Sequence, residues 1–267
     1  MIFNFISNIY LSCDASINIC MKNLVIQYYI DINLYPEVKK NSPSWLKIQS
    51  TNTEKYSEYS FKKYCAKYGH DFLRVSEPAL LYRHPTWERF DLFFNNKWLD
   101  EYDQILYVDT DVFAFDHAPD IFNHNLGIKS FKSPAYTKYR GMNDSQIKSS
   151  MHTIFDNCDL DSIRKVFFQS GVWMINKNCR DIMMPWVQKW KEFDCDDGQF
   201  LNWCVVQSGI EYHDLSPMFN VKNNGLFKDW NYRKTYFLHS AGGRKYRDDS
   251  PLYNFLSSTF PAVSQDA

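Results

Sequence analysis

Glycine is scarce in this sequence, with only nine glycines among 267 residues. The chain contains neither G-x-G-x-x-G nor G-x-x-x-x-G-K-[ST], the patterns in which backbone N–H groups of a glycine-rich loop hold phosphate. If the protein binds a phosphate group, a metal ion and basic side chains must therefore neutralise its charge.

Paired cysteines, basic runs and long apolar runs are also missing. The seven cysteines are scattered without a C-x-x-C pair, which argues against a disulfide framework or a zinc ribbon and is typical of a reducing compartment. The formal net charge is −1 and no basic run is longer than two residues, so no nucleic-acid partner is expected. No apolar run reaches the roughly 18 residues of a membrane span. We therefore expect a soluble cytoplasmic protein without a transmembrane segment, and leave peripheral membrane association open.

The most informative stretch is Gln104–Val112. The apolar run from Ile105 to Val108 predicts a buried strand, and Asp109 and Asp111 follow it directly. Ligands of open α/β sheets lie beyond the carboxyl ends of the strands. In an extended segment, side chains two residues apart leave on the same side, and two adjacent carboxylates repel each other unless a cation lies between them. The pattern indicates a site for Mg²⁺ or Mn²⁺, although an ordinary polar turn is the competing interpretation.

The first half of the chain alternates between predicted strands and helices. Strands are expected over 23–30, 71–75 and the stretch that ends at Asp109, and helices over 53–68, with Gly69 as the stop, and 86–102, with Thr86 as the N-cap. This order predicts one half of a doubly wound parallel sheet, with nucleotide bound at its switch point.

The second half has a more mixed pattern. Strands are expected over 127–131, 166–176 and 236–239, and helices over 144–157, 178–193 and a segment capped by Asp196 or Asp197. Gly171 interrupts the second of these strands, which often marks a bulge or a close approach of the backbone to a ligand.

Two motifs at opposite ends of the chain give a family resemblance. Leu106-Tyr-Val-Asp-Thr-Asp111 and His239-Ser-Ala-Gly-Gly-Arg-Lys245 together resemble nucleotide-sugar glycosyltransferases of the GT-A fold, most closely the glycogenin-type and bacterial galactosyltransferase-type members of glycosyltransferase family 8. The pattern departs from the family in three places. Gln169 stands where the family has Asn before Ser170-Gly171, one residue is inserted between Asp197 and Gln199, and Tyr246-Arg247 replaces Pro-Trp after Lys245.

The resemblance implies an α/β GT-A fold, a Rossmann-like mixed sheet with helices on both faces of a single domain. Residues 1–20 are expected to be a lead-in segment and 21–267 the glycosyltransferase domain, with 21–112 as its nucleotide-binding half and 113–267 as its acceptor half. The implied metal ligands are Asp109, Asp111 and His239, and the implied cofactor is Mn²⁺ or Mg²⁺. An ordinary histidine at a strand end is the alternative for His239.

The resemblance also implies donor and catalytic residues. Those expected to bind the donor, besides the metal ligands, are Tyr28, Tyr29, Arg89, Thr110, Gly171, Gly242 and Lys245, with Arg83 as a rival of Arg89. Asp197, Gln199 and Gln169 are expected near the reacting carbon, with Asp196 as a rival of Asp197. Tyr28 and Tyr29 also fit ordinary core positions. Trp186, Trp190, Trp203 and Trp230 either stack on sugar rings or pack in the core.

The expected activity is metal-dependent transfer of a sugar from a UDP-sugar donor to a glycan or glycoprotein acceptor, with retention at the anomeric carbon. Two alternatives stay open. One is a non-catalytic relative that binds a sugar or nucleotide, because the Gln169 and Asp197–Gln199 sites are altered. The other is a haloacid-dehalogenase-type phosphatase, whose motif also begins with D-x-D, although Phe113 stands where it requires Thr or Val.

Overall fold

The structure is a computed structural model that describes residues 21–36, 40, 53–124, 130–134, 142–150, 153–155, 158–222, 232–240 and 251–265. The expected lead-in segment 1–20 lies outside these residues, as do Trp230, Gly242 and Lys245. Among the described helices, none is both long enough and apolar enough to cross a membrane.

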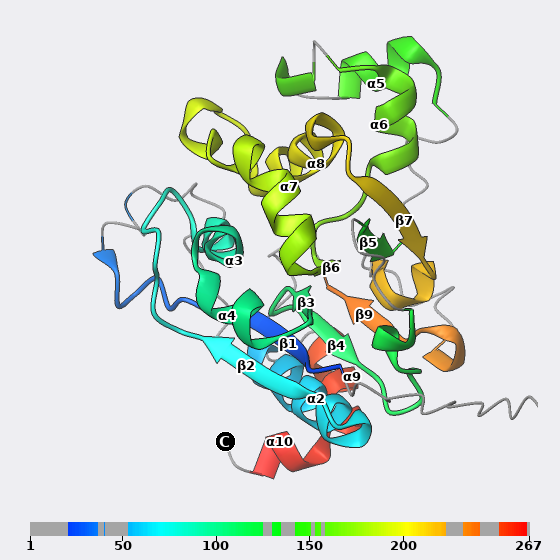
Figure 1. Cartoon of the computed structure of the whole chain (residues 1–267). Helices are drawn as coiled ribbons and strands as arrows, with labels where there is room; N and C mark the ends of the chain where they lie inside the picture. The colour runs from blue at the N-terminus through cyan, green and yellow to red at the C-terminus, as the bar shows by residue number, and fades with distance from the viewer. Residues whose placement is uncertain are drawn as a thin grey trace, which may run out of the picture.

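A six-stranded sheet with the order β2-β1-β3-β6-β5-β7 forms the centre of the fold (Figure 1). Strands β2, β1 and β3 are parallel, as the alternating pattern of the first half predicts. Strand β6 runs antiparallel to both β3 and β5, and β7 is parallel to β5. The sheet is therefore mixed. The strands are β1 (Asn23–Tyr28), β2 (Asp71–Val75), β3 (Gln104–Val108), β5 (Ser130–Pro134), β6 (Val172–Ile175) and β7 (Glu211–Leu215).

A second sheet of three short strands lies beside the first. Its order is β4-β9-β8, with β4 (Val112–Ala114) antiparallel to β9 (Phe237–His239) and β8 (Val221–Lys222) parallel to β9. Only β9 corresponds to a predicted strand. Strands of two or three residues are too short to show an alternating pattern, so the sequence gives no local signal for β4 and β8.

Alternate side chains of the central strands enter two different cores. One face, which includes Ile26, Tyr107 and Trp173, packs against α7 (Lys177–Val187) and α8 (Asp197–Ser208). The other face, which includes Val25 and Leu106, packs against α2 (Thr53–Tyr68) and the small sheet. Figure 1 shows α2 on one side of the sheet and α7 and α8 on the other. Burial on both faces explains why these strands are apolar at successive positions.

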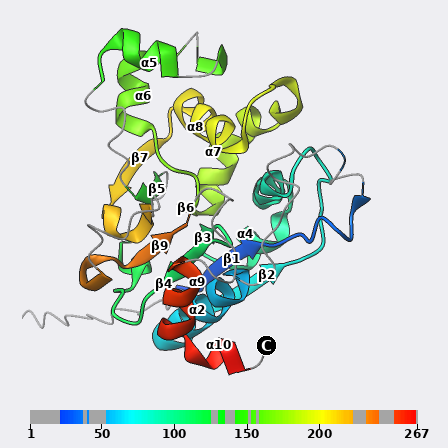
Figure 2. The same ribbon diagram turned by 180° about the vertical axis from the view of Figure 1, so that it is seen from behind.

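The carboxyl-terminal helices cover the outer face of the small sheet. Helices α9 (Pro251–Thr259) and α10 (Pro261–Gln265) enclose a third core with Phe113 and Leu238. Seen from behind, α9 lies beside α2 (Figure 2). This packing holds β9, the strand that ends at His239, against the rest of the fold.

Several predicted elements have different limits in the structure. Helix α2 and its stop at Gly69, where φ is +74°, are confirmed. The helix predicted over 86–102 is three pieces, η2 (Pro85–Phe90), α3 (Asp91–Phe94) and α4 (Asn96–Glu101). Its N-cap is His84 rather than Thr86, and Asn95 interrupts it because its backbone is extended and its side chain caps Lys97.

The strand predicted over 166–176, with its interruption at 169–171, is confirmed only after the interruption. Helix α6 (Leu160–Val166) reaches into that range, and only residues 172–175 form β6. The reason lies at Phe168, whose N–H and carbonyl bind the side chain of Asn202 at 2.8 and 2.9 Å instead of a neighbouring strand. Residues 167–171 are therefore a connection tied to α8, and they lead directly to Gly171.

The other predicted helices are shorter than expected. The helix over 144–157 is α5 (Asp144–Ser150) followed by η5 (Thr153–Phe155), and the helix over 178–193 is α7 followed by η6 (Trp190–Glu192). Pro185 lies inside α7. Asp196, not Asp197, caps α8 by accepting the Gln199 N–H at 2.7 Å. The remaining short turns are η3 (Ile121–Asn123), η7 (Pro217–Asn220) and η9 (Tyr232–Lys234).

Candidate functional site

Two antiparallel strand pairs converge on the Asp109–Asp111 turn. Strand β3 ends beside the start of β6, where Val108 pairs with Val172 and the Asp109 N–H donates to the Gly171 carbonyl at 2.8 Å. Strand β4 begins beside the end of β9, where Val112 pairs with His239. The register of both pairs therefore brings Gly171 and His239 to the same turn from distant parts of the chain.

Asp109, Asp111 and His239 form a cluster with the composition of a metal site. One potential ligand atom from each residue lies within 4.8 Å of the others. His239 Nε2 is 3.3 Å from Asp111 Oδ1 and 3.8 Å from Asp109 Oδ2. The histidine side chain is 4% exposed, whereas the two carboxylates are 21% and 28% exposed, so the cluster opens to solvent on the side of the aspartates.

Asn220 orients the imidazole of His239. The Asn220 amide donates from Nδ2 to the Gln169 carbonyl at 3.3 Å, which places its Oδ1 2.8 Å from His239 Nδ1. An amide oxygen only accepts hydrogen bonds, so Nδ1 carries a proton, and Nε2 is the ring nitrogen that faces the aspartates. A metal-binding histidine is commonly held in this way by its other ring nitrogen. No sequence motif marked Asn220.

Gly171 is required by the close approach of the backbone to this cluster. A Cβ atom at this position would lie 2.3 Å from His239 Cε1 and 2.9 Å from Asp109 Oδ2. No side chain fits there, because the atoms in its way belong to two of the three clustered residues. The expected close approach of Gly171 to a ligand site is thus an approach to the candidate metal ligands themselves.

Arg89 connects the cluster to α8, because it pairs with both Asp109 and Asp197. Its side chain is 2% exposed, and its Nη2 lies 2.9 Å from Asp109 Oδ1 and 3.0 Å from Asp197 Oδ2. Its other bonds run from Nε to the Thr86 carbonyl and from Nη1 to the Ser170 carbonyl, both at 2.8 Å. Burial lowers the pKa of Arg89, but Asp109 and Asp197 outweigh that effect and raise it, so the guanidinium is a permanent charge.

Asp197 is held by both of its oxygens. Thr86 Oγ1 donates to Oδ1 at 2.9 Å, and Arg89 pairs with Oδ2. Its neighbour Asp196 is the helix cap, which separates the roles of the two rivals. Asp197 is therefore a fixed carboxylate that shares a guanidinium with Asp109, and Arg83, the rival of Arg89, instead pairs with Asp194 at 2.8 Å.

The other two candidate catalytic residues are Gln199 and Gln169. Gln199 is in the first turn of α8, and its Oε1 is buried and finds no hydrogen-bond donor among the residues that the structure describes. Gln169 is half-buried, and its carbonyl is the acceptor for Asn220. A buried amide oxygen without a donor is costly, so Gln199 presents an acceptor that a ligand hydroxyl can satisfy.

The charges of the cluster shift its acid–base equilibria. Burial raises the pKa of Asp109, with Arg89 opposing the shift and Asp111 adding to it. Burial lowers the pKa of His239, but Asp111 and Asp109 outweigh it and leave that pKa raised. Burial is therefore the main cause of the Asp109 shift, whereas the two nearby aspartates cause the net rise at His239. A cation bound between these groups would offset the charge of the two carboxylates.

Tyr28 and Tyr29, expected at the nucleoside base, face opposite sides of the sheet. Tyr28 is buried, and its hydroxyl donates to Asp91 Oδ2 at 3.1 Å. Burial, with Asp91, raises the pKa of Tyr28 well above its usual range. Tyr29 is half-exposed, the guanidinium of Arg74 lies 4.4 Å from its ring centre, and burial raises its pKa to about 12. Only Tyr29 offers a ring at the surface beyond β1.

The remaining expected site residues divide into two groups. Thr110 lies in the turn between the two aspartates, and Gly242 and Lys245 are outside the described residues. Of the tryptophans, Trp190 and Trp203 are buried in the core on the α7 and α8 side, and Trp186 packs edge-on against Trp203 with ring centres 5.8 Å apart. These contacts support the core interpretation of the three.

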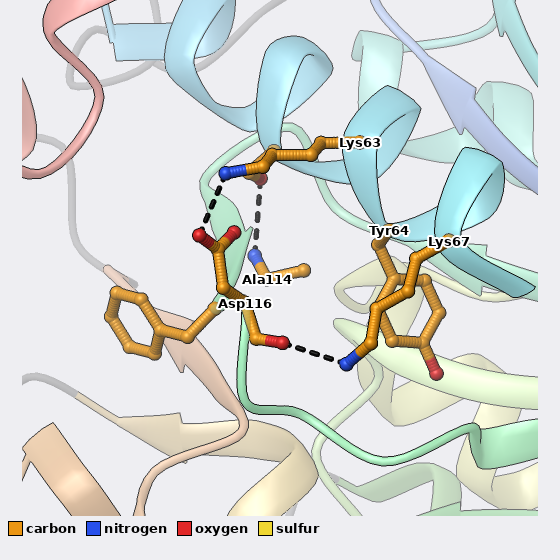
Figure 3. A pocket seen from close by; sticks show the side chains of 7 residues that line it. Lys63, Tyr64, Lys67, Ala114 and Asp116 are labelled. Carbon is orange, nitrogen blue, oxygen red and sulfur yellow. Dashed lines mark hydrogen bonds and ion pairs between the residues drawn. The ribbon is translucent and has the colours of Figure 1, made fainter.

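A separate cavity of about 230 Å³ lies between α2 and the segment after β4 (Figure 3). Its two lysines are already engaged, Lys63 Nζ with the Asp116 carboxylate at 2.6 Å and Lys67 Nζ with the Asp116 carbonyl at 2.7 Å. The cavity lies at the far end of β4 from Asp111, so it is not part of the cluster.

No protein-family model matches this chain, and no curated protein matches it either. Solved structures do. A glycosyltransferase involved in the glycosylation of the major capsid of PBCV-1 matches with a TM-score of 0.53 and 11% identity, covering 91% of this chain and 99% of that one. The galactosyltransferase LgtC, solved with donor and acceptor sugar analogs, has a TM-score of 0.47 and 15% identity, covering 91% and 95%. The glycosyltransferase GlyE of Streptococcus pneumoniae TIGR4 has 0.48 and 15%, covering 92% of this chain but 63% of its own.

At these identities the likeness concerns the fold, and the match above a TM-score of 0.5 carries it. The chain has the mixed α/β fold of GT-A glycosyltransferase structures, in one domain, which confirms the fold expected from the two motifs. Function has to be argued from the site, because one fold supports many activities.

Proposed function

We propose that this protein is a metal-dependent glycosyltransferase, similar to those of family 8, that transfers a sugar from a UDP-sugar to a glycan or glycoprotein acceptor with retention. The observation that carries the proposal is the cluster of Asp109, Asp111 and His239, whose ligand atoms lie within 4.8 Å of one another. It occurs beyond the carboxyl end of β3, where ligands of open α/β sheets bind, and in a fold shared with glycosyltransferases.

The donor atoms of the cluster suit a hard or borderline divalent ion. Two carboxylates and an imidazole fit Mn²⁺ better than an all-oxygen set would, and Asn220 leaves His239 Nε2 free to bind. Asp109, Asp111 and His239 would hold the ion. When bound, such an ion supplies positive charge for the diphosphate that leaves as the glycosidic bond breaks.

The surrounding residues of the chain have roles that do not require the ion. Arg89 holds Asp109 and Asp197 at a fixed separation, because both carboxylates bind the same nitrogen. Asp197, with both oxygens held from inside the protein, is suited to accept hydrogen bonds from sugar hydroxyls. Gln199 Oε1 adds a second acceptor from the same helix turn. Together they orient a donor sugar beside the diphosphate.

The proposal is tested by UDP release from a panel of UDP-sugars, measured with and without Mn²⁺ and with EDTA. We expect turnover, even as slow hydrolysis without acceptor, that EDTA abolishes. Asp111→Asn should lower it by about 100-fold or more, since the variant loses a ligand and a charge. The variant should still fold, which circular dichroism checks, because the Asp111 side chain is 28% exposed and asparagine has nearly the same size.

The matched control is Asp116→Asn. Asp116 is exposed and pairs with Lys63 away from the cluster (Figure 3), so this variant should keep full turnover. A protein that binds UDP and turns nothing over is a binding relative rather than an enzyme. One that hydrolyses a simple phosphoester and ignores UDP-sugars is a phosphatase, and the proposal is then wrong.

A further inference from the structure

The charges of the cluster itself do not offset the negative charge of a bound diphosphate. Asp109, Asp111 and Asp197 carry three negative charges, which Arg89 and a bound divalent ion offset in full. The phosphate groups of a nucleoside diphosphate then add further negative charge. A charged ligand that leaves water needs opposite charge close by, so at least one more cation is required.

Arg89 does not supply that cation. Its Nε, Nη1 and Nη2 bind the Thr86 carbonyl, the Ser170 carbonyl, and the two carboxylates of Asp109 and Asp197. These bonds use all but one of the guanidinium N–H groups. The side chain is 2% exposed, so it does not lie on the side of the cluster that opens to solvent. Its charge is therefore committed to the protein interior.

Lys222 is placed on the open side by the register of the small sheet. In the parallel pair of β8 and β9, Lys222 is the direct partner of His239. Residues that pair directly across a sheet project their side chains on the same face. Lys222 therefore leaves the sheet beside the imidazole that faces Asp109 and Asp111.

Asn220 keeps the start of β8 beside the same imidazole. It is the last residue of η7 (Pro217–Asn220), directly before β8, and its Oδ1 lies 2.8 Å from His239 Nδ1. The chain therefore passes His239 as it enters the strand that carries Lys222.

The Lys222 side chain is available for a ligand. The residue is exposed, and no hydrogen bond or ion pair engages it within the part of the chain that the structure describes. The flexible stem of a lysine carries a compact charge, suited to phosphate oxygens.

We propose that Lys222 binds the diphosphate of the nucleotide donor, on the side of the candidate metal site opposite to Arg89. This proposal rests on the proposed function, since it assigns a further residue to the same site. Lys245, expected at the diphosphate from the family resemblance, belongs to a different segment, so Lys222 is an additional cation and not a substitute for it.

The test is titration of the full-length protein with UDP in the presence of Mn²⁺, followed by calorimetry. Lys222→Ala should weaken UDP binding about ten-fold, as expected for one lost bond to a charged group. Its affinity for uridine, which has no phosphate, should be unchanged, and so should its Mn²⁺ affinity without nucleotide. Lys222→Arg should bind UDP nearly as well as the wild-type protein.

The matched control is Lys148→Ala, an equal change of charge at an exposed residue of α5, far from the cluster (Figure 1). It should leave UDP binding unchanged. If wild-type protein binds UDP and Lys222→Ala binds it equally well, or if the loss is the same for uridine, the assignment of Lys222 is wrong while the proposed function stands. If wild-type protein binds no UDP, both proposals fail.

Discussion

On one side of the Asp109–Asp111 turn lies Arg89, and on the other side lies His239. On the Arg89 side, two carboxylates share a buried guanidinium, and the hydroxyl of Tyr107 also donates to Asp109. On the His239 side, Asp111 and the imidazole face each other at 3.3 Å. The first side carries the permanent positive charge of Arg89, whereas the second gathers the ligand atoms of the candidate metal site.

The difference shows how one turn serves both the fold and a ligand. Arg89 is present whether or not a ligand is bound, so the charges on its side contribute to folding. Asp111 and His239 present ligand atoms 3.3 Å apart, which a cation can bind. We therefore expect substitutions on the two sides to separate, with loss of stability on the Arg89 side and loss of ligand binding on the His239 side.

The largest effect is expected from Arg89→Met. The variant leaves Asp109 and Asp197 without their shared cation in a partly desolvated place, which should cost about 3 kcal/mol in the free energy of unfolding. Methionine keeps much of the packing volume, so lost charge rather than a cavity dominates. Urea denaturation of the metal-free protein measures the change.

Arg164→Met is the control for that measurement. Arg164 also binds two carboxylates, Asp144 and Asp161, but both are exposed. Water screens such pairs, so this variant should unfold at nearly the same urea concentration as the wild-type protein. Equal effects of the two substitutions would contradict the distinction between the buried and the exposed network.

An intermediate effect is expected from Asn220→Leu. Without an acceptor at His239 Nδ1, the imidazole loses its fixed tautomer and orientation, and Mn²⁺ affinity should fall about 10- to 100-fold. Asn220→Asp keeps the acceptor and should lose far less. Mn²⁺ titration followed by electron paramagnetic resonance measures both variants, and unchanged affinity in Asn220→Leu would show that Asn220 does not position His239.

The smallest effect on stability is expected from protonation of His84, which lies on the Arg89 side of the turn. Burial lowers its pKa from 6.5 to about 4, while Asp197 opposes the shift. The unfolded chain therefore takes up the proton first as the pH falls, and this contribution to stability, complete above pH 6.5, is lost between 6.5 and 4. Between about pH 7 and 5.5 the loss should be about 1 kcal/mol.

His84→Asn tests this assignment, because asparagine keeps the N-cap without titrating. Thermal or urea unfolding at several pH values should show a flatter dependence in the variant than in the wild-type protein over that range. Parallel curves for the two proteins would mean that His84 does not contribute to the pH dependence.

The parts of the fold that follow from consecutive residues were predictable. The apolar runs of β1 and β3, the helix α2 with its stop at Gly69, and the cap before α8 all lie within a few residues of their signals. Prediction failed where a distant side chain took over a backbone bond. Asn202 does this at Phe168, and no local pattern in residues 166–176 reveals it.

Local sequence patterns were enough to predict the parallel first half of the sheet and the pair of aspartates at its carboxyl end. A motif near the end of the chain also led us to expect His239, although only by resemblance. The tertiary structure decided that Arg89 joins Asp109 to Asp197, that Asn220 orients His239, and that Lys222 stands beside it. Periodicity and capping act between near neighbours in the chain, whereas these contacts depend on the register between strands and helices far apart in sequence, and packing of the whole fold sets that register.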